Sequence, residues 1–221
     1  YIYTTFESGN WGYAGPLPEE INGPLVKRLD ISGSLTGGGD AVYISPNAYV
    51  QEINVLRGAS LQGGIRSLWN PDGSDKYYTR HLNPETLITN LTFGLAMDSN
   101  GNALPGKADA NFAMVYAGDI NGPKSLAVSV EGGRLQYNGT ANVISVSNKA
   151  GDTLAGNGTF NISSLAGTVL DNRYANDFVN LGILAPGGGA PGKMTVNLGQ
   201  YGNFISHGTL NIGFTAAGRH D

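Results

Sequence analysis

The stretch GDTLAGNGT, residues 151–159, carries the pattern that decides the fold. A glycine is followed two or three residues later by a leucine, and then by a turn rich in glycine or asparagine. The leucines of the six copies in the chain are separated by 26, 74, 19, 30 and 26 residues, and the longest gap is close to three of the others. A period of about 20–30 residues is typical of solenoids, whose units stack because none buries its apolar face alone. The other copies are GSLTGGGD (33–40), GASLQGGI (58–65), GGRLQYNGT (132–140), LGILAPGGG (181–189) and HGTLNIG (207–213), with the six leucines at Leu35, Leu61, Leu135, Leu154, Leu184 and Leu210.

The composition agrees with a chain that turns often and still folds. Among 221 residues there are 34 glycines and 22 asparagines, whereas charged residues make up only 14%, well below the roughly 25% of an average globular domain. Hydrophobic residues nevertheless reach 40%. That share is enough for a continuous core, so the composition does not indicate a disordered linker.

Alternating apolar and polar residues predict strands almost throughout. This period of two marks a strand with one buried face, and no window keeps a helical apolar period beyond two turns. The sequence therefore predicts an all-β protein. The alternating stretches are 91–97, 126–130, 194–198 and 210–214.

The short strands and their Asn-Gly and Gly-Gly turns fit either a sandwich of hairpins or a solenoid coil. The solenoid period and the small or branched aliphatic residues expected inside favour the coil. We predict a single right-handed, single-stranded parallel β-helix over residues 1–221, with about 7–10 rungs of about 20–25 residues each. Residues 68–86 and 99–111 interrupt the pattern and are expected to leave the coil as loop excursions, which in repeat proteins often carry specificity.

Charge and residue usage exclude several classes of partner and cofactor. The net charge is −4 and no cluster of Lys and Arg is present, which argues against nucleic acid as a partner. No run of 18 apolar residues predicts a direct membrane span. The absence of cysteine excludes disulfides and thiolate ligands, and His81, His207 and His220 share no metal-ligand spacing. We expect no metal site and no cofactor.

The candidate binding residues are aromatic and lie in or beside the first excursion. Trp69, Tyr77, Tyr78 and His81 would form a surface site if their rings were exposed, since such rings bind sugars and proteins alike. The alternative is that the aromatic rings stack in the core or cap an end, and that His81 lies on a solvated loop.

Other candidate site residues are weaker. An Asp-x-Arg-x-x-x-Asp run, with Asp171, Arg173 and Asp177, is the best place for polysaccharide chemistry, which needs clustered carboxylates or basic groups. The stretch 37–40, Gly-Gly-Gly-Asp, lacks the second copy that a calcium-binding repeat requires. Four Asn-x-Ser/Thr acceptors, which include Asn90, occur by chance in such a composition.

The C-terminal third of the chain resembles a known family. GDTLAGNGTFNI (151–162), FVNLGILAPGGGAPGKMTVNLGQYGNF (178–204) and HGTLNIGF (207–214) are similar to the last rungs of autotransporter passenger domains of Gram-negative bacteria. The segment 41–65, with Trp69-Asn70-Pro71 after it, resembles the stalk of the members that carry a subtilisin-like protease head. His207-Gly208-Thr209 matches the short motif around a subtilase histidine, but no catalytic serine or aspartate motif accompanies it, so no catalytic residue is expected.

This resemblance implies a function for the chain. The chain would be a non-catalytic stalk of a type V secreted protein at the bacterial cell surface, with its own catalytic head before it and a C-terminal β-barrel after it. Residues 151–221 would assist folding and export. The start at Tyr1 without Met, and the end just after a strand pattern, predict a piece of a longer protein.

Two other classes remain open at this point. One is an adhesin or self-association module, which would use exposed ladders or open β-helix edges. The other is a polysaccharide-active enzyme.

Overall fold

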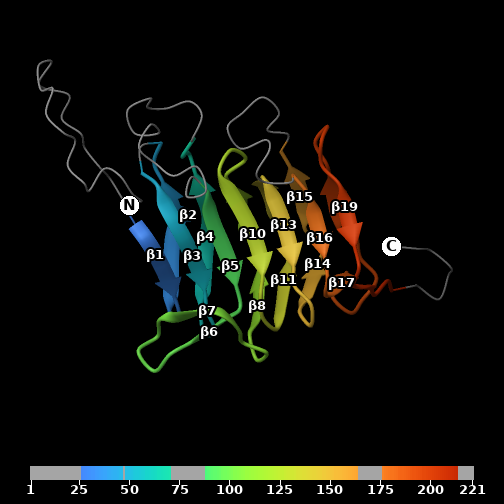
Figure 1. Ribbon diagram of the computed structural model, residues 1–221, viewed down its shortest axis with the longest axis horizontal. Coiled ribbons are helices and arrows are strands. Elements are labelled where there is room, and N and C mark those ends of the chain that lie inside the picture. The colour runs from blue at the N-terminus through green and yellow to red at the C-terminus, as the bar shows by residue number, and fades with distance from the viewer. Residues whose placement is uncertain (1–25, 47, 71–87, 164–175, 214–221) are drawn as a thin grey trace, which may run out of the picture.

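The computed structural model describes residues 26–46, 48–70, 88–163 and 176–213, and nearly all of their strands belong to three parallel sheets (Figure 1). Each sheet takes one strand from successive turns of the chain, so each turn is one rung of a coil. The predicted all-β parallel β-helix is confirmed. Seven rungs are described, because the largest sheet has seven strands.

The three sheets are composed as follows. The seven-stranded sheet has the order β1 (Val26–Ile31), β3 (Val50–Val55), β5 (Thr89–Phe93), β10 (Leu126–Val130), β13 (Ser145–Asn148), β16 (Phe178–Asn180) and β19 (Phe204–Ser206). The six-stranded sheet has β2 (Ser34–Ile44), β4 (Ser60–Ser67), β9 (Ile120–Asn121), β12 (Thr140–Val143), β15 (Thr159–Ile162) and β18 (Thr195–Asn197). The five-stranded sheet has β8 (Ala113–Tyr116), β11 (Arg134–Tyr137), β14 (Thr153–Gly156), β17 (Ile183–Pro186) and β20 (Thr209–Leu210).

The repeated leucines lie on top of one another. Leu35 pairs with Leu61 between β2 and β4, and a second column runs through β11, β14, β17 and β20. Equivalent positions of successive rungs therefore meet in register, as the period predicts. The second column consists of Leu135, Leu154, Leu184 and Leu210.

The 74-residue gap between two of the leucines contains fewer rungs than its length suggests. Between β4 and β11 there is one intervening rung, β5, β8 and β9, in which Met114 pairs with Leu135. The gap is thus two rungs with long insertions, not three regular periods. Where no insertion occurs the rungs keep close to the expected length, since paired Val128 and Val146 are 18 residues apart and Phe178 and Phe204 are 26 apart.

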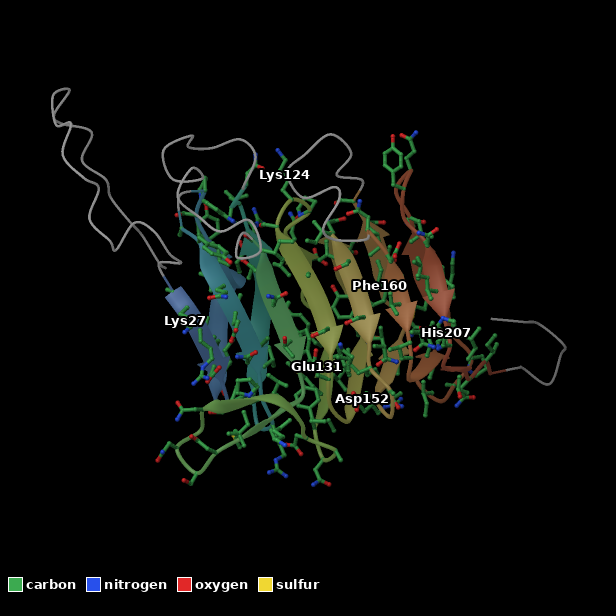
Figure 2. All side chains as sticks on the ribbon, viewed as in Figure 1. Lys27, Lys124, Glu131, Asp152, Phe160 and His207 are labelled. Atoms are coloured by element: carbon green, nitrogen blue, oxygen red, sulfur yellow. The ribbon has the colours of Figure 1, made fainter. Side chains whose placement is uncertain are left out.

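The interior contains a column of aromatic rings as well as the expected aliphatic residues. Neighbouring ring centroids lie 5.3–6.4 Å apart, within the range of favourable aromatic pairs. The expectation of small or branched aliphatic side chains inside was therefore incomplete. The column consists of the buried rings of Phe93, Tyr116, Tyr137, Phe160 and Phe178 and ends on the partly exposed ring of Phe204. Phe160 is labelled in Figure 2.

Asparagines form a polar column where the strands of the seven-stranded sheet end. Asn148 donates from Nδ2 to Asn180 Oδ1 at 2.8 Å, and Asn180 donates to Ser206 Oγ at 3.1 Å. Asn148 and Asn180 are fully buried. Their amides also reach backbone carbonyls of Ile183 and Thr209. The side-chain amide donors of this corner are thus bonded to the next turn of the chain, whereas Asn148 Oδ1 is buried without a hydrogen-bond partner.

The alternation over residues 91–97 is not one strand. β5 ends at Phe93, and Gly94 has a φ of +88°, which turns the chain out of the coil. A Cβ at this position would lie 2.3 Å from Gly132 O, so both conformation and space require glycine. Residues 95–108 instead form an antiparallel hairpin, β6 (Leu95–Met97) and β7 (Ala103–Ala108). This hairpin includes much of the predicted excursion 99–111 and lies across the lower end of the seven-stranded sheet in Figure 1.

Candidate functional site

A polar hollow lies on the outward side of the seven-stranded sheet. It consists of two adjoining depressions, of about 300 and 170 Å³, which share Asn90, Thr92 and Glu131. We call the two together the outer groove. Its other lining residues are Glu52, Asn54, Leu95, Pro105, Gly106, Ala127, Val128, Ser129, Ser145, Ser147 and Lys149.

The floor of the outer groove is made by two rows of side chains that cross the strands. Successive residues of a strand point to opposite faces, so residues two apart share one face. The registers align them across β3, β5, β10 and β13. Small residues in both rows, in place of the long charged side chains usual on a surface, leave the hollow. The rows are Glu52, Asn90, Ala127 and Ser145, and Asn54, Thr92, Ser129 and Ser147.

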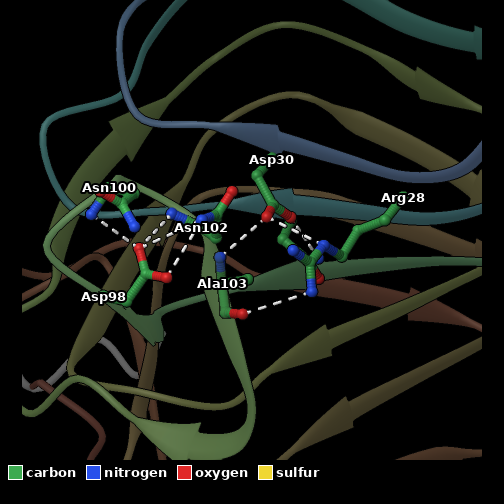
Figure 3. Close-up of polar contacts among 7 residues, drawn as sticks. Arg28, Asp30, Asp98, Asn100, Asn102 and Ala103 are labelled. Carbon is green, nitrogen blue, oxygen red and sulfur yellow. Dashed lines mark hydrogen bonds and ion pairs between the residues drawn. The ribbon is translucent and has the colours of Figure 1, made fainter.

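The β6–β7 hairpin walls the outer groove at one end. Asp30 anchors this hairpin, because its Oδ2 accepts a hydrogen bond from Ala103 N at 2.8 Å and an ion pair from Arg28 Nε at 3.0 Å (Figure 3). Its Oδ1 accepts from Asn54 Nδ2 at 2.8 Å. Asp98 closes the hairpin turn, because its carboxylate accepts hydrogen bonds from the side chain and backbone of Asn102 and from the backbone of Asn100, and these bonds hold the pKa of its carboxyl below the usual value. The wall is therefore tied to the rungs beneath it.

The charged groups of the outer groove are few. Glu131 follows β10 and appears near the lower end of the sheet in Figure 2. Its Oε1 lies 3.8 Å from Lys149 Nζ, a long ion pair with a half-exposed lysine. Glu52 adds a second carboxylate. Two carboxylates and one lysine give the lining a net negative charge.

Trp69 is not a surface aromatic. Only 2% of its surface is exposed, and its ring stacks on the buried ring of Tyr49 with centroids 5.4 Å apart. Trp69 also borders a separate hollow of about 420 Å³ with Leu68 and Lys124. The prediction of an exposed sugar-binding or protein-binding ring is wrong for this residue, since its apolar area is used in packing. Tyr77, Tyr78 and His81 lie outside the described residues.

The other polar candidates have structural contacts where they are described. Asp177 is buried, and its Oδ1 accepts from Asn203 N at 2.8 Å and from Asn203 Nδ2 at 3.0 Å. This carboxylate therefore holds the turn before β19. Asp171 and Arg173 lie outside the described residues. His207 is exposed at the start of a turn, and Asp40 pairs with Arg66 at 3.0 Å.

Within the described part of the chain, no group of three or more His, Cys, Asp or Glu side chains could hold a metal ion. The same residues include no helix with the length and apolar character needed to cross a bilayer.

The residues that line the outer groove were missed in the sequence because nothing marks them as a set. Apart from Glu52, the two rows of the floor are Ser, Thr, Asn and Ala at ordinary strand positions. Only the register brings them to one face. Comparison of the chain with protein-family models, with curated proteins and with solved structures gives no match.

Proposed function

We propose that this chain is a non-catalytic β-helical stalk of a type V secreted protein, an autotransporter passenger exposed at the bacterial cell surface. The observation that carries the proposal is the in-register stacking of all three sheets up to the last described rung. Such a rod holds its two ends at a fixed separation. That property suits a spacer between a protease head and a membrane-embedded barrel.

The rung geometry also supports a role in folding during export. The exposed edge of each sheet carries unpaired backbone groups that can pair with the next strand. If the C-terminal rungs leave the membrane first and fold, each later rung adds to a formed edge. Folding then draws the chain outward.

A matched pair of substitutions tests this role. The full chain would be expressed in a Gram-negative host between an epitope-tagged reporter and an outer-membrane barrel, and antibody access to the epitope on intact cells would be measured. Leu184→Asp places an unpaired charge in the interior of β17, and Leu91→Asp does so in β5. We expect a several-fold loss of surface epitope for the first and a smaller loss for the second. Equal losses would contradict folding from the C-terminal end.

The nature of the head and the barrel has a separate test. The reading frame on either side of the chain should encode a subtilisin-like catalytic unit before it and about a dozen amphipathic strands after it, as a single-chain outer-membrane barrel requires. A frame without these two parts would refute the stalk assignment.

A self-association module is the second candidate, and one observation favours it. In the described residues two of the three last strands of the sheets, β19 and β20, carry exposed apolar side chains, with Phe204 at 43% and Leu210 at 49% exposure. Analytical ultracentrifugation of the full chain should then show concentration-dependent association that Leu210→Lys abolishes. A strictly monomeric species at high concentration would exclude this candidate.

A further inference from the structure

The outer groove has a chemistry that a stalk does not need. We propose that it binds a neutral oligosaccharide, a role beyond that of a spacer. The inference starts from the backbone of its floor. β3, β5, β10 and β13 each pair with a strand on both sides. Their N–H and C=O groups are therefore committed, and an extended peptide cannot be bound there as an added strand.

Recognition in the outer groove must come from side chains, and these are mainly hydroxyl and amide groups. Ser129 Oγ bonds to Thr92 Oγ1 at 3.3 Å. Within the described part of the chain, no hydrogen bond engages the side chains of Asn90, Ser145 and Ser147. Hydroxyls and amides both donate and accept, which is the pattern that matches the hydroxyls of a sugar.

The charges of the outer groove narrow the ligand class further. The carboxylates of Glu52 and Glu131 repel an anionic polymer, and the single lysine, Lys149, is itself beside Glu131. Carboxylates also accept strong hydrogen bonds from neutral hydroxyls. An uncharged ligand rich in hydroxyl groups meets these conditions, whereas an acidic polysaccharide or a nucleic acid does not.

The shape of the outer groove favours an oligomer. It crosses four strands, which at about 4.8 Å per strand spacing gives a length of about 14 Å. Leu95 and Pro105 of the hairpin supply an apolar wall at one end, against which the C–H face of a sugar ring can pack. Because the hollow is open and shallow, we expect dissociation constants on the order of 1 mM.

The test is a titration of the full ¹⁵N-labelled chain followed by NMR. The probes are soluble linear oligosaccharides of glucose, mannose, galactose and N-acetylglucosamine, with an oligogalacturonate as the anionic probe. At least one neutral probe should shift the amide signals of residues 90–92, 127–131 and 145–149. The proposal is overturned if no neutral probe shifts these signals, or if the anionic probe binds there more tightly.

Two variants locate the site, and a third serves as the control. Ala127→Trp fills the outer groove, and Asn90→Ala removes an amide without filling it. Ala113→Trp is the matched control, because Ala113 is an exposed alanine on β8 of another sheet. We expect at least a ten-fold weaker affinity for Ala127→Trp, a smaller loss for Asn90→Ala and no change for Ala113→Trp. Unchanged affinity in both groove variants, with circular dichroism like that of the parent, would overturn the proposal.

Discussion

Replacement of Phe160 by alanine or leucine should reveal how much the aromatic column contributes to stability. Phe160 is 2% exposed, and its ring centroid lies 5.3 Å from that of Tyr137 and 5.4 Å from that of Phe178. It is an internal member of the column, so its removal breaks two ring contacts. Alanine also leaves a cavity, whereas leucine retains much of the volume.

The magnitudes follow from burial and from the number of ring pairs. A buried Phe→Ala change costs about 3–5 kcal/mol, which lowers the Tm by about 6–20 °C for a chain of this length. The leucine variant loses two ring pairs, worth about 1–3 kcal/mol together, and its Tm should fall by about 2–12 °C. The control is Ile120→Leu, since Ile120 is buried on the same inward side but belongs to no ring pair. It should cost less than about 1.5 kcal/mol.

Differential scanning calorimetry measures these changes, and hydrogen exchange shows where they act. Rungs contact only their neighbours, so protection should fall most in β14, β15 and β16. A double-mutant cycle of Tyr137→Leu with Phe160→Leu should give a coupling energy of about 0.5–1.5 kcal/mol. If Phe160→Leu and Ile120→Leu have the same Tm and the coupling energy between Tyr137 and Phe160 is zero, the rings only fill space. Our reasoning on a specific contribution of the column would then be refuted.

Three further predictions concern buried polar groups. Asn180→Ala should lower the free energy of unfolding, measured by urea denaturation, by about 1–3 kcal/mol, because it removes a bonded buried amide. Asn90→Ala is the control, since Asn90 is exposed on the outer face of the same sheet, and it should change the free energy of unfolding by less than about 0.5 kcal/mol. Burial raises the pKa of Tyr137 well above its usual value of 10.0, so the folded state holds its proton longer than the unfolded chain and stability should fall as the pH rises above about 10. Thermal melts of Tyr137→Phe should show a smaller alkaline loss, and an identical pH profile would refute this assignment. Burial, and then the charge of Glu131, raise the pKa of the Asp152 carboxyl above 3.8 in the folded protein. The folded state therefore favours the protonated carboxyl, and the stability that this group contributes is fully present below pH 3.8 and is lost as the pH rises through the folded pKa. Asp152→Asn should therefore raise the Tm at neutral pH relative to the parent, with the difference vanishing in acid; a Tm difference that does not change with pH would contradict the assignment.

The fold class could be read from the sequence because its cause is local and repeated. Each unit in which Leu154 or Leu184 precedes a glycine-rich turn has one apolar face and cannot bury it alone. Such units must stack, and the pairing of Leu154 with Leu184 and of Leu184 with Leu210 follows directly. Alternation correctly located strands such as β10, since its period does not depend on distant residues.

The sequence could not show where the chain leaves the coil. The alternation of residues 91–97 continues through Gly94, but a φ of +88° at that glycine ends β5 and starts the hairpin. Burial of Trp69 likewise depends on Tyr49, twenty residues earlier, whose ring lies against it. The identity of an aromatic residue does not reveal whether its face is exposed.

The sequence by itself determined that this protein is a charge-poor, turn-rich stack of parallel rungs with leucines in register, because period and alternation act between neighbours along the chain. Only the tertiary structure decided the aromatic column and the outer groove. The rings come from strands of all three sheets, and the groove joins small residues of four strands that lie far apart in sequence. Their proximity depends on the register of the rungs and on the length of each insertion, which no local pattern specifies.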